Sequence, residues 1–64
     1  MTVTEALKHF NSNGGSMGIN WTWAYFPTDQ DATGFDEWCN ANGYETRGVY
    51  PPFNDNPGWG VRYR

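Results

Sequence analysis

The chain contains a single cysteine, Cys39, and a single histidine, His9, among its 64 residues. One cysteine excludes an intrachain disulfide, and a structural zinc site of the usual type needs four Cys or His ligands. A chain of this length is expected to form one small domain, residues 1–64, which hides only about 60% of the surface that its unfolded chain exposes. We therefore expect its stability to come from unusually good packing or from association with another chain.

Long apolar runs and basic residues are also scarce. No segment approaches the roughly 20 apolar residues that a membrane-spanning helix needs, and the first residues lack the basic-then-apolar pattern of an export signal. These absences predict a cytoplasmic protein without a membrane partner. Seven acidic residues against four Lys and Arg give a formal charge of −3, which disfavours wholesale binding to a polyanion.

Side chains suited to catalysis are few. A nucleophile pair formed by Cys39 and His9 would still need a third, orienting group and an oxyanion site. Catalysis also needs a pocket, and a chain of this length barely fills its own core. We interpret Cys39 as a small buried hydrophobic residue and His9 as solvated. The sequence predicts a protein that is not an enzyme and that has no cofactor.

Aromatic residues, in contrast, are abundant, because the chain has four Trp, four Tyr and four Phe. An enclosed aromatic side chain buries about 150–250 Å². The rings therefore exceed what one small core easily encloses. We expect some of them to face a partner, which is either another protein or a second copy of the chain.

Two short helices are predicted from capping signals and apolar spacing. Thr2 and Glu5 fit a capping box at the start of the first helix, which is predicted to stop at Asn13-Gly14-Gly15. Thr33 is predicted to cap a second helix over residues 34–42.

Three strands are predicted, at residues 17–26, 44–50 and 59–63. The strand-helix-strand unit in the middle should place its two strands parallel, and the last strand should run antiparallel to both. The predicted fold class is therefore α+β, a two-layer sandwich with the order α-β-α-β-β. In it, two short helices cover one face of a three-stranded mixed sheet, and the other face stays open.

Alternation along each strand predicts which side chains face the helices. The core side of residues 17–26 is predicted to consist of Ile19, Trp21, Trp23 and Tyr25. The core side of the last strand is predicted to consist of Trp59, Val61 and Tyr63. Arg62 and Arg64 then point toward the open face.

Residues 29–34 partly match the opening of an EF-hand calcium loop, in which oxygen ligands alternate along the chain. Asp29, Asp31 and Thr33 would supply these oxygens. The match fails where calcium affinity is set, because position twelve is Asn40 and not a glutamate. A capped helix with acids in its first turn explains the same residues. No metal site is predicted, and weak cation binding by Asp29, Asp31 and Thr33 is left as an alternative.

The candidate binding residues combine the open sheet face with a long loop at residues 51–58. Arginine and exposed aromatic side chains are enriched at protein interfaces. The predicted binding residues are Arg47, Tyr50, Phe53, Arg62 and Arg64.

These patterns predict a small non-enzymatic protein-binding module that acts by steric docking, as an inhibitor, an adaptor or an accessory subunit. Small acidic proteins of this kind are common among phage and mobile-element accessory factors. The alternative is single-stranded nucleic acid binding through an aromatic and arginine sheet face. The negative charge and the predicted inward direction of the rings disfavour this alternative. The docking hypothesis itself assumes that the rings lie inside and the arginines outermost.

Overall fold

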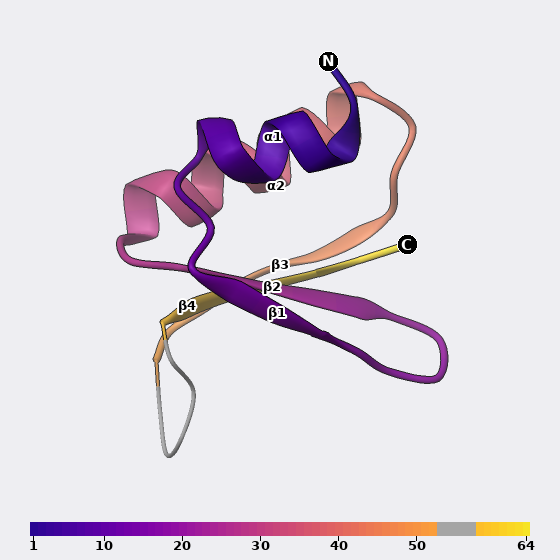
Figure 1. Ribbon diagram of the computed structural model, residues 1–64. Helices are drawn as coiled ribbons and strands as arrows, with labels where there is room; N and C mark the ends of the chain where they lie inside the picture. Colours follow the sequence, from indigo (N-terminus) through magenta and orange to yellow (C-terminus); the bar gives the residue numbers. More distant parts are fainter. Residues whose placement is uncertain (53–57) are drawn as a thin grey trace.

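Two helices and four strands follow one another in the order α1, β1, β2, α2, β3, β4 (Figure 1). The computed structural model describes residues 1–52 and 58–64. The elements are α1 (Val3–His9), β1 (Gly14–Met17), β2 (Thr22–Phe26), α2 (Asp29–Ala41), β3 (Thr46–Tyr50) and β4 (Trp59–Tyr63). Both helices cover one face of the sheet, and the other face is left open (Figure 1).

The α+β class with two helices on one sheet face is confirmed, but the sheet is neither three-stranded nor mixed. It has four strands in the order β1-β2-β4-β3, and every neighbouring pair is antiparallel. β4 lies between β2 and β3, so the two strands that flank α2 run in the same direction without pairing. β4 pairs with β2 on one side and with β3 on the other, and both pairs are antiparallel. An antiparallel pair is slightly more stable per residue than a parallel one.

Residues 17–26, predicted as one strand, contain a tight turn. The Gly18 N–H donates to the Trp21 carbonyl at 2.7 Å, and this bond closes a two-residue loop between β1 and β2. The sequence pattern hides the turn because the segment is rich in aromatic and β-branched residues. The glycine-rich β1 before it has little strand propensity of its own.

The capping box of the first helix is confirmed. Thr2 Oγ1 accepts the Glu5 N–H at 3.2 Å, and Glu5 Oε1 accepts the Thr2 N–H at 2.7 Å. Two hydrogen bonds hold the pKa of Glu5 below its usual value. The one with the Thr2 backbone has the larger effect, and the one with the Thr2 side chain has the smaller effect. The helix ends at His9, which is exposed as predicted, and Asn11 then takes a φ of 63° as the chain turns toward β1.

The second helix begins earlier than predicted, at Asp29 instead of residue 34. Its cap is Thr28, whose Oγ1 accepts the Asp31 N–H at 3.1 Å. Thr33 is not the cap, and its hydroxyl donates to Asp29 Oδ1 at 3.1 Å within the helix. Acids in the first turn complement the helix dipole, which favours this earlier start. The residues that partly match a calcium loop are helical, so they do not form the loop that the EF-hand geometry requires.

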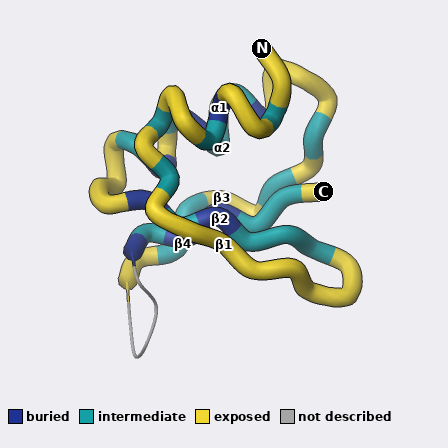
Figure 2. Tube along the Cα trace, viewed as in Figure 1, coloured by how far each residue is buried: buried dark blue, intermediate teal, exposed yellow. Residues whose placement is uncertain are grey.

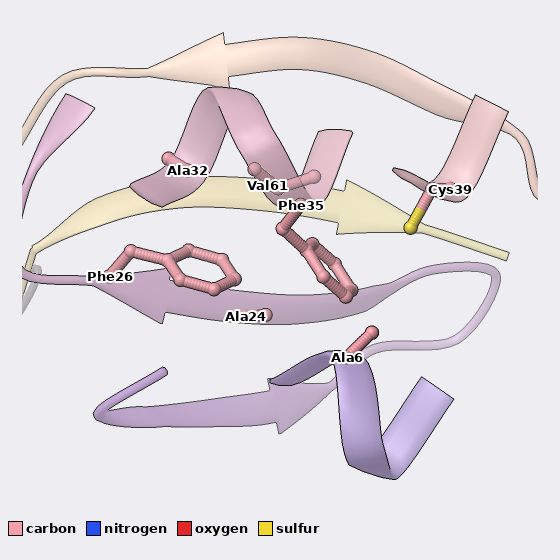
Figure 3. Packing of buried hydrophobic residues seen from close by; sticks show 7 residues of the cluster. All are labelled: Ala6, Ala24, Phe26, Ala32, Phe35, Cys39 and Val61. Carbon is pink, nitrogen blue, oxygen red and sulfur yellow. The ribbon is translucent and has the colours of Figure 1, made fainter. Parts of the chain in front are cut away.

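The core lies between the helices and the sheet. Among the described residues it consists of Ala6, Ala24, Phe26, Ala32, Phe35, Cys39 and Val61 (Figure 3). Only Phe26 and Phe35 are large rings, with centroids 5.1 Å apart, and the alanines let the layers approach closely. Cys39 is buried as predicted. Burial, with a smaller contribution from Asp36, raises the pKa of its thiol to about 12, so the thiol stays protonated and unreactive.

Candidate functional site

Seven side chains gather on the sheet face that the helices leave open, and we call them the arginine–aromatic surface. They are Trp21, Trp23, Tyr25, Arg47, Tyr50, Arg62 and Arg64. The register of the two central strands brings them together. β2 and β4 pair Trp23 with Arg62 on this face, whereas Ala24 pairs with Val61 on the helix side.

The predicted direction of Trp21, Trp23 and Tyr25, which lie in β2 and directly before it, is wrong. Ala24 is buried toward the helices, whereas Trp21, Trp23 and Tyr25 lie half-buried on the open face. Ile19 is also misplaced by the prediction, because it lies in the β1–β2 turn and is 100% exposed. The physical reason is volume: the thin space between sheet and helices accepts the alanine, and indole rings in its place would not fit a close-packed core.

The last strand follows its prediction. Its helix-facing residues are Trp59, Val61 and Tyr63. Tyr63 meets the ring of Phe35 edge to face, at 5.3 Å between centroids. Arg62 is therefore directed to the open face, together with Arg64.

Arg62 lies at the centre of the surface. Its guanidinium carbon is 5.3 Å from the ring centroid of Trp21, 5.7 Å from that of Trp23 and 5.4 Å from that of Tyr50. Its Nη2 donates a hydrogen bond to the Tyr50 hydroxyl at 3.0 Å, and its Nε is buried without a partner among the described residues. Rings on several sides thus fix this guanidinium in place before any ligand arrives.

Trp21 is the ring on which the arginines converge. The guanidinium carbon of Arg64 lies 4.2 Å from its centroid, and those of Arg62 and Arg47 lie at 5.3 and 5.5 Å. Such contacts stabilise by about 0.5–1 kcal/mol each at exposed sites. Glu45 ion-pairs with Arg64 at 3.1 Å and with Arg47 at 3.4 Å. Both ion pairs are exposed, so they contribute little to stability.

The other rings of the arginine–aromatic surface pack over β4. Trp23 and Tyr25 are stacked, with centroids 6.2 Å apart and planes within 9° of parallel, and Tyr50 meets Trp23 edge to face at 5.5 Å. A Cβ on Gly60 would lie 3.1 Å from the Trp23 ring and 3.5 Å from the Tyr25 ring. Glycine at this position therefore allows the two rings to lie close against the strand.

The two layers of the molecule carry opposite charge. All three arginines of the chain belong to the arginine–aromatic surface. The acidic residues of the helices are Glu5, Asp29, Asp31, Asp36 and Glu37. The formal charge of −3 therefore conceals a positive sheet face, which attracts anionic groups locally.

The structure brings most of the predicted binding residues together. The predicted residues on the surface are Arg47, Tyr50, Arg62 and Arg64. Phe53 lies outside the described residues. Sequence reasoning misses Trp21, Trp23 and Tyr25. Two sequence signals point to them: the chain has more rings than a small core encloses, and Gly60 in the neighbouring strand leaves room for flat-lying rings.

Comparison of the chain with protein-family models, with curated proteins and with solved structures finds no match. Within residues 1–52 and 58–64, no three His, Cys, Asp or Glu side chains are grouped so that they would hold a metal ion. Neither helix of this described part is long and apolar enough to cross a membrane. The arginine–aromatic surface is therefore the feature from which we infer a function.

Proposed function

We propose that the chain is a non-enzymatic protein-binding module that docks a partner onto the arginine–aromatic surface. It would act sterically, as an inhibitor, an adaptor or an accessory subunit. The observation that supports this most is the convergence of three guanidinium groups on the Trp21 ring, at 4.2–5.5 Å. Trp, Tyr and Arg are the residue types that carry most of the binding energy at protein interfaces.

The partner that fits this surface presents carboxylates beside an apolar patch. Guanidinium groups bind carboxylates through paired hydrogen bonds, and the flat rings of Trp23 and Tyr25 offer apolar area next to them. Because Arg62 is already held by rings, little side-chain entropy is lost when it binds. The acidic helices would repel such a partner, so its approach is from the sheet side.

The compartment proposed for this module is the cytoplasm. Cys39 is a free thiol, and unpaired cysteines are typical of reducing compartments. Because Cys39 is buried, it does not form a disulfide with a partner protein.

Single-stranded nucleic acid is the second candidate ligand. The outward direction of Trp23 and Tyr25 favours it, because rings on a sheet face stack on bases while arginines contact phosphates. Two observations favour protein over nucleic acid. Glu45 pairs with two of the three arginines, and the formal charge is −3. Both weaken the attraction for a phosphate chain, whose affinity comes mostly from charge, more than for a protein partner that also contributes apolar area.

A peptide library displayed on phage and selected on the immobilised protein tests the proposal. We expect the selected peptides to combine Asp or Glu with aromatic or aliphatic residues. Arg62→Gln should weaken their binding at least about tenfold, which corresponds to about 1.4 kcal/mol. Lys8→Gln removes the same charge from α1, outside the surface, and should leave binding unchanged. Peptides that bind the wild type and Arg62→Gln equally well would rule out this docking surface.

Labelled single-stranded oligonucleotides, measured in the same assay, separate the two candidate ligands. Binding of acidic peptides without measurable oligonucleotide binding at moderate salt supports a protein partner. Micromolar oligonucleotide binding with a steep salt dependence, lost in Trp23→Ala, would instead assign the surface to nucleic acid.

A further inference from the structure

The two edges of the sheet are built differently. The β3 edge has features that discourage pairing with another strand. They are the register shift between Thr46 and Val49, the charged Arg47, Gly48 at a φ of 83°, and Pro51–Pro52 directly after the strand. β1, at the opposite edge, has the sequence GGSM, with no charged residue, no register shift against β2 and no proline directly after it. Its first residue, Gly14, is the one described position of β1 with a positive φ, at 147°.

The β1 edge is open and uncharged. Within the described residues β1 pairs only with β2, and all its residues are exposed (Figure 2). The sequence from Phe10 to Thr28 contains no Asp, Glu, Lys or Arg, so no charge repels a second strand here. Met17 and Ile19 are large apolar side chains with exposures of 87% and 100%. Such an edge is a template for strand pairing.

The outward-facing backbone groups of β1 follow from the hairpin geometry. Gly18 donates to the Trp21 carbonyl, and hydrogen-bonded pairs recur at every second residue of an antiparallel ladder. Ser16 belongs to the next such pair with β2. Gly15 and Met17 therefore direct their N–H and C=O groups away from β2, toward the position of an additional strand.

A hollow lies beside β1 on the helix side of the sheet. Its volume is about 460 Å³, and its lining includes Leu7, Gly15, Met17 and Tyr63. The tip of the β1–β2 hairpin extends beyond the helices in Figure 1. Gly15 has no side chain, and a Cβ at this position would run into the Trp23 carbonyl oxygen, so β1 and β2 lie close together beside this hollow.

We propose that β1 pairs antiparallel with β1 of a second copy of this chain, around a two-fold axis at Ser16. In this register Gly15 lies opposite Met17 of the second copy, and the outward backbone groups of these residues bond across the axis. Each Met17 then lies beside a glycine on the helix side, where it covers the hollow of the other copy. The same patch serves both copies, as in most homodimers.

A second copy fits this edge better than a foreign strand because the edge is complementary to itself. Across the axis, the long side chain of Met17 in each copy lies opposite Gly15 of the other copy. The uncharged segment from residue 10 to residue 28 brings no like charges together. A strand of four residues buries little area, so the dimer belongs to the weak and transient class of interfaces.

The pairing has a consequence for binding that goes beyond the docking proposed for a single copy. A two-fold axis between antiparallel strands is perpendicular to the sheet, so both open faces lie on the same side. Four strands from each copy give one sheet of eight strands with two arginine–aromatic surfaces. An elongated or repetitive partner that contacts both surfaces gains avidity of about 10²–10⁴ over a single contact.

Sedimentation equilibrium between about 1 µM and about 1 mM tests the pairing. Ser16 meets Ser16 of the second copy at the axis, so Ser16→Lys and Ser16→Glu each place like charges opposite one another. We expect the wild type to dimerise, and each variant alone to raise the dissociation constant several-fold. An equimolar mixture of the two variants should associate again, as a heterodimer.

Asn20→Lys, in the turn of the hairpin, is the matched control and should dimerise like the wild type. Circular dichroism shows whether each variant is folded. Where a Ser16 variant fails to fold, Met17→Ser replaces it and should also weaken the dimer. A wild type that stays monomeric to about 1 mM would overturn the proposal. Folded Ser16 variants that dimerise like the wild type, or whose mixture does not associate, would overturn it as well.

Discussion

Aromatic residues lie on both sides of this sheet, but their surroundings differ. On the helix side, Phe26 and Phe35 are fully buried, and further rings pack against them: Trp38, Tyr44 and Tyr63. On the open side the rings contact guanidinium groups or one another and remain half-exposed. The first arrangement hides apolar area, and the second keeps apolar area at the surface beside charge. The neighbours of a ring, more than the ring itself, thus show whether it serves stability or recognition.

Truncating a ring on each side should affect stability unequally. Phe35→Ala is expected to lower the free energy of unfolding by about 3–5 kcal/mol, because a fully buried side chain leaves a cavity. Trp23→Ala removes a larger but half-exposed ring and should cost about 1–2 kcal/mol. Urea denaturation followed by far-ultraviolet circular dichroism measures both losses. Equal losses would show that the open-face rings belong to the stabilising core, and the distinction between the two sides would fail.

The buried thiol on the helix side makes the stability of the fold depend on pH. Burial raises the pKa of Cys39 from 9.0 to about 12, and burial also raises the pKa of Tyr63. The folded chain therefore holds these protons at a pH where the unfolded chain releases them. Their contribution to stability is complete below pH 9.0 and is lost as the pH rises toward 12.

Urea denaturation at several pH values above neutral tests this dependence. We expect the free energy of unfolding to fall as the solution becomes alkaline, and to fall less steeply in Cys39→Ala. The opposite sign, or an unchanged slope in the variant, would mean that the thiol titrates freely in the folded state. A thiol reagent provides a second readout, since the buried Cys39 should react more slowly in the native protein than in urea.

Local signals predict the elements of this fold better than they predict its packing. The capping box of Thr2 and Glu5 and the strand at residues 59–63 depend on a few neighbouring residues, and both are present. The position of β4 between β2 and β3 depends on which edges are free after the chain has folded back. The inward direction of Ala24 depends on the volume left under the helices. A local sequence pattern contains neither the free strand edges nor the volume left under the helices.

The same reason explains why sequence patterns predict four of the seven side chains of the candidate site and miss the other three. Alternation in β4 places Arg62 on the open face, because the apolar residues Trp59, Val61 and Tyr63 occupy every second position and identify the buried side of the strand. In β2, rings at every second position have the same period whichever side they face. Period two therefore identifies Trp21, Trp23 and Tyr25 as one set but does not give their direction. A count of rings against core volume shows that some rings face outward, but it does not say which ones.

A double-mutant cycle measures the contact that distinguishes the open side. The guanidinium carbon of Arg64 lies 4.2 Å from the Trp21 centroid, so Trp21→Ala and Arg64→Gln should show a coupling free energy of about 0.5–1 kcal/mol. Trp21→Ala combined with Lys8→Gln, which changes a cation on α1, should be additive. Unfolding in urea of the single and double variants supplies both cycles. No coupling between Trp21 and Arg64 would mean that the arginine is near the ring without being held by it.

The smallest effect on stability is expected at Glu45. Its ion pairs with Arg47 and Arg64 are exposed, so Glu45→Gln should change the free energy of unfolding by no more than about 0.5 kcal/mol. The same change frees two arginines, and acidic peptides should bind several-fold more tightly at about 0.15 M salt. Glu37→Gln on α2 alters the net charge equally but acts from the opposite layer, where salt screens it beyond about 8 Å. If both variants strengthened binding alike, the ligand would be responding to net charge alone, and the sheet face would have no privileged role.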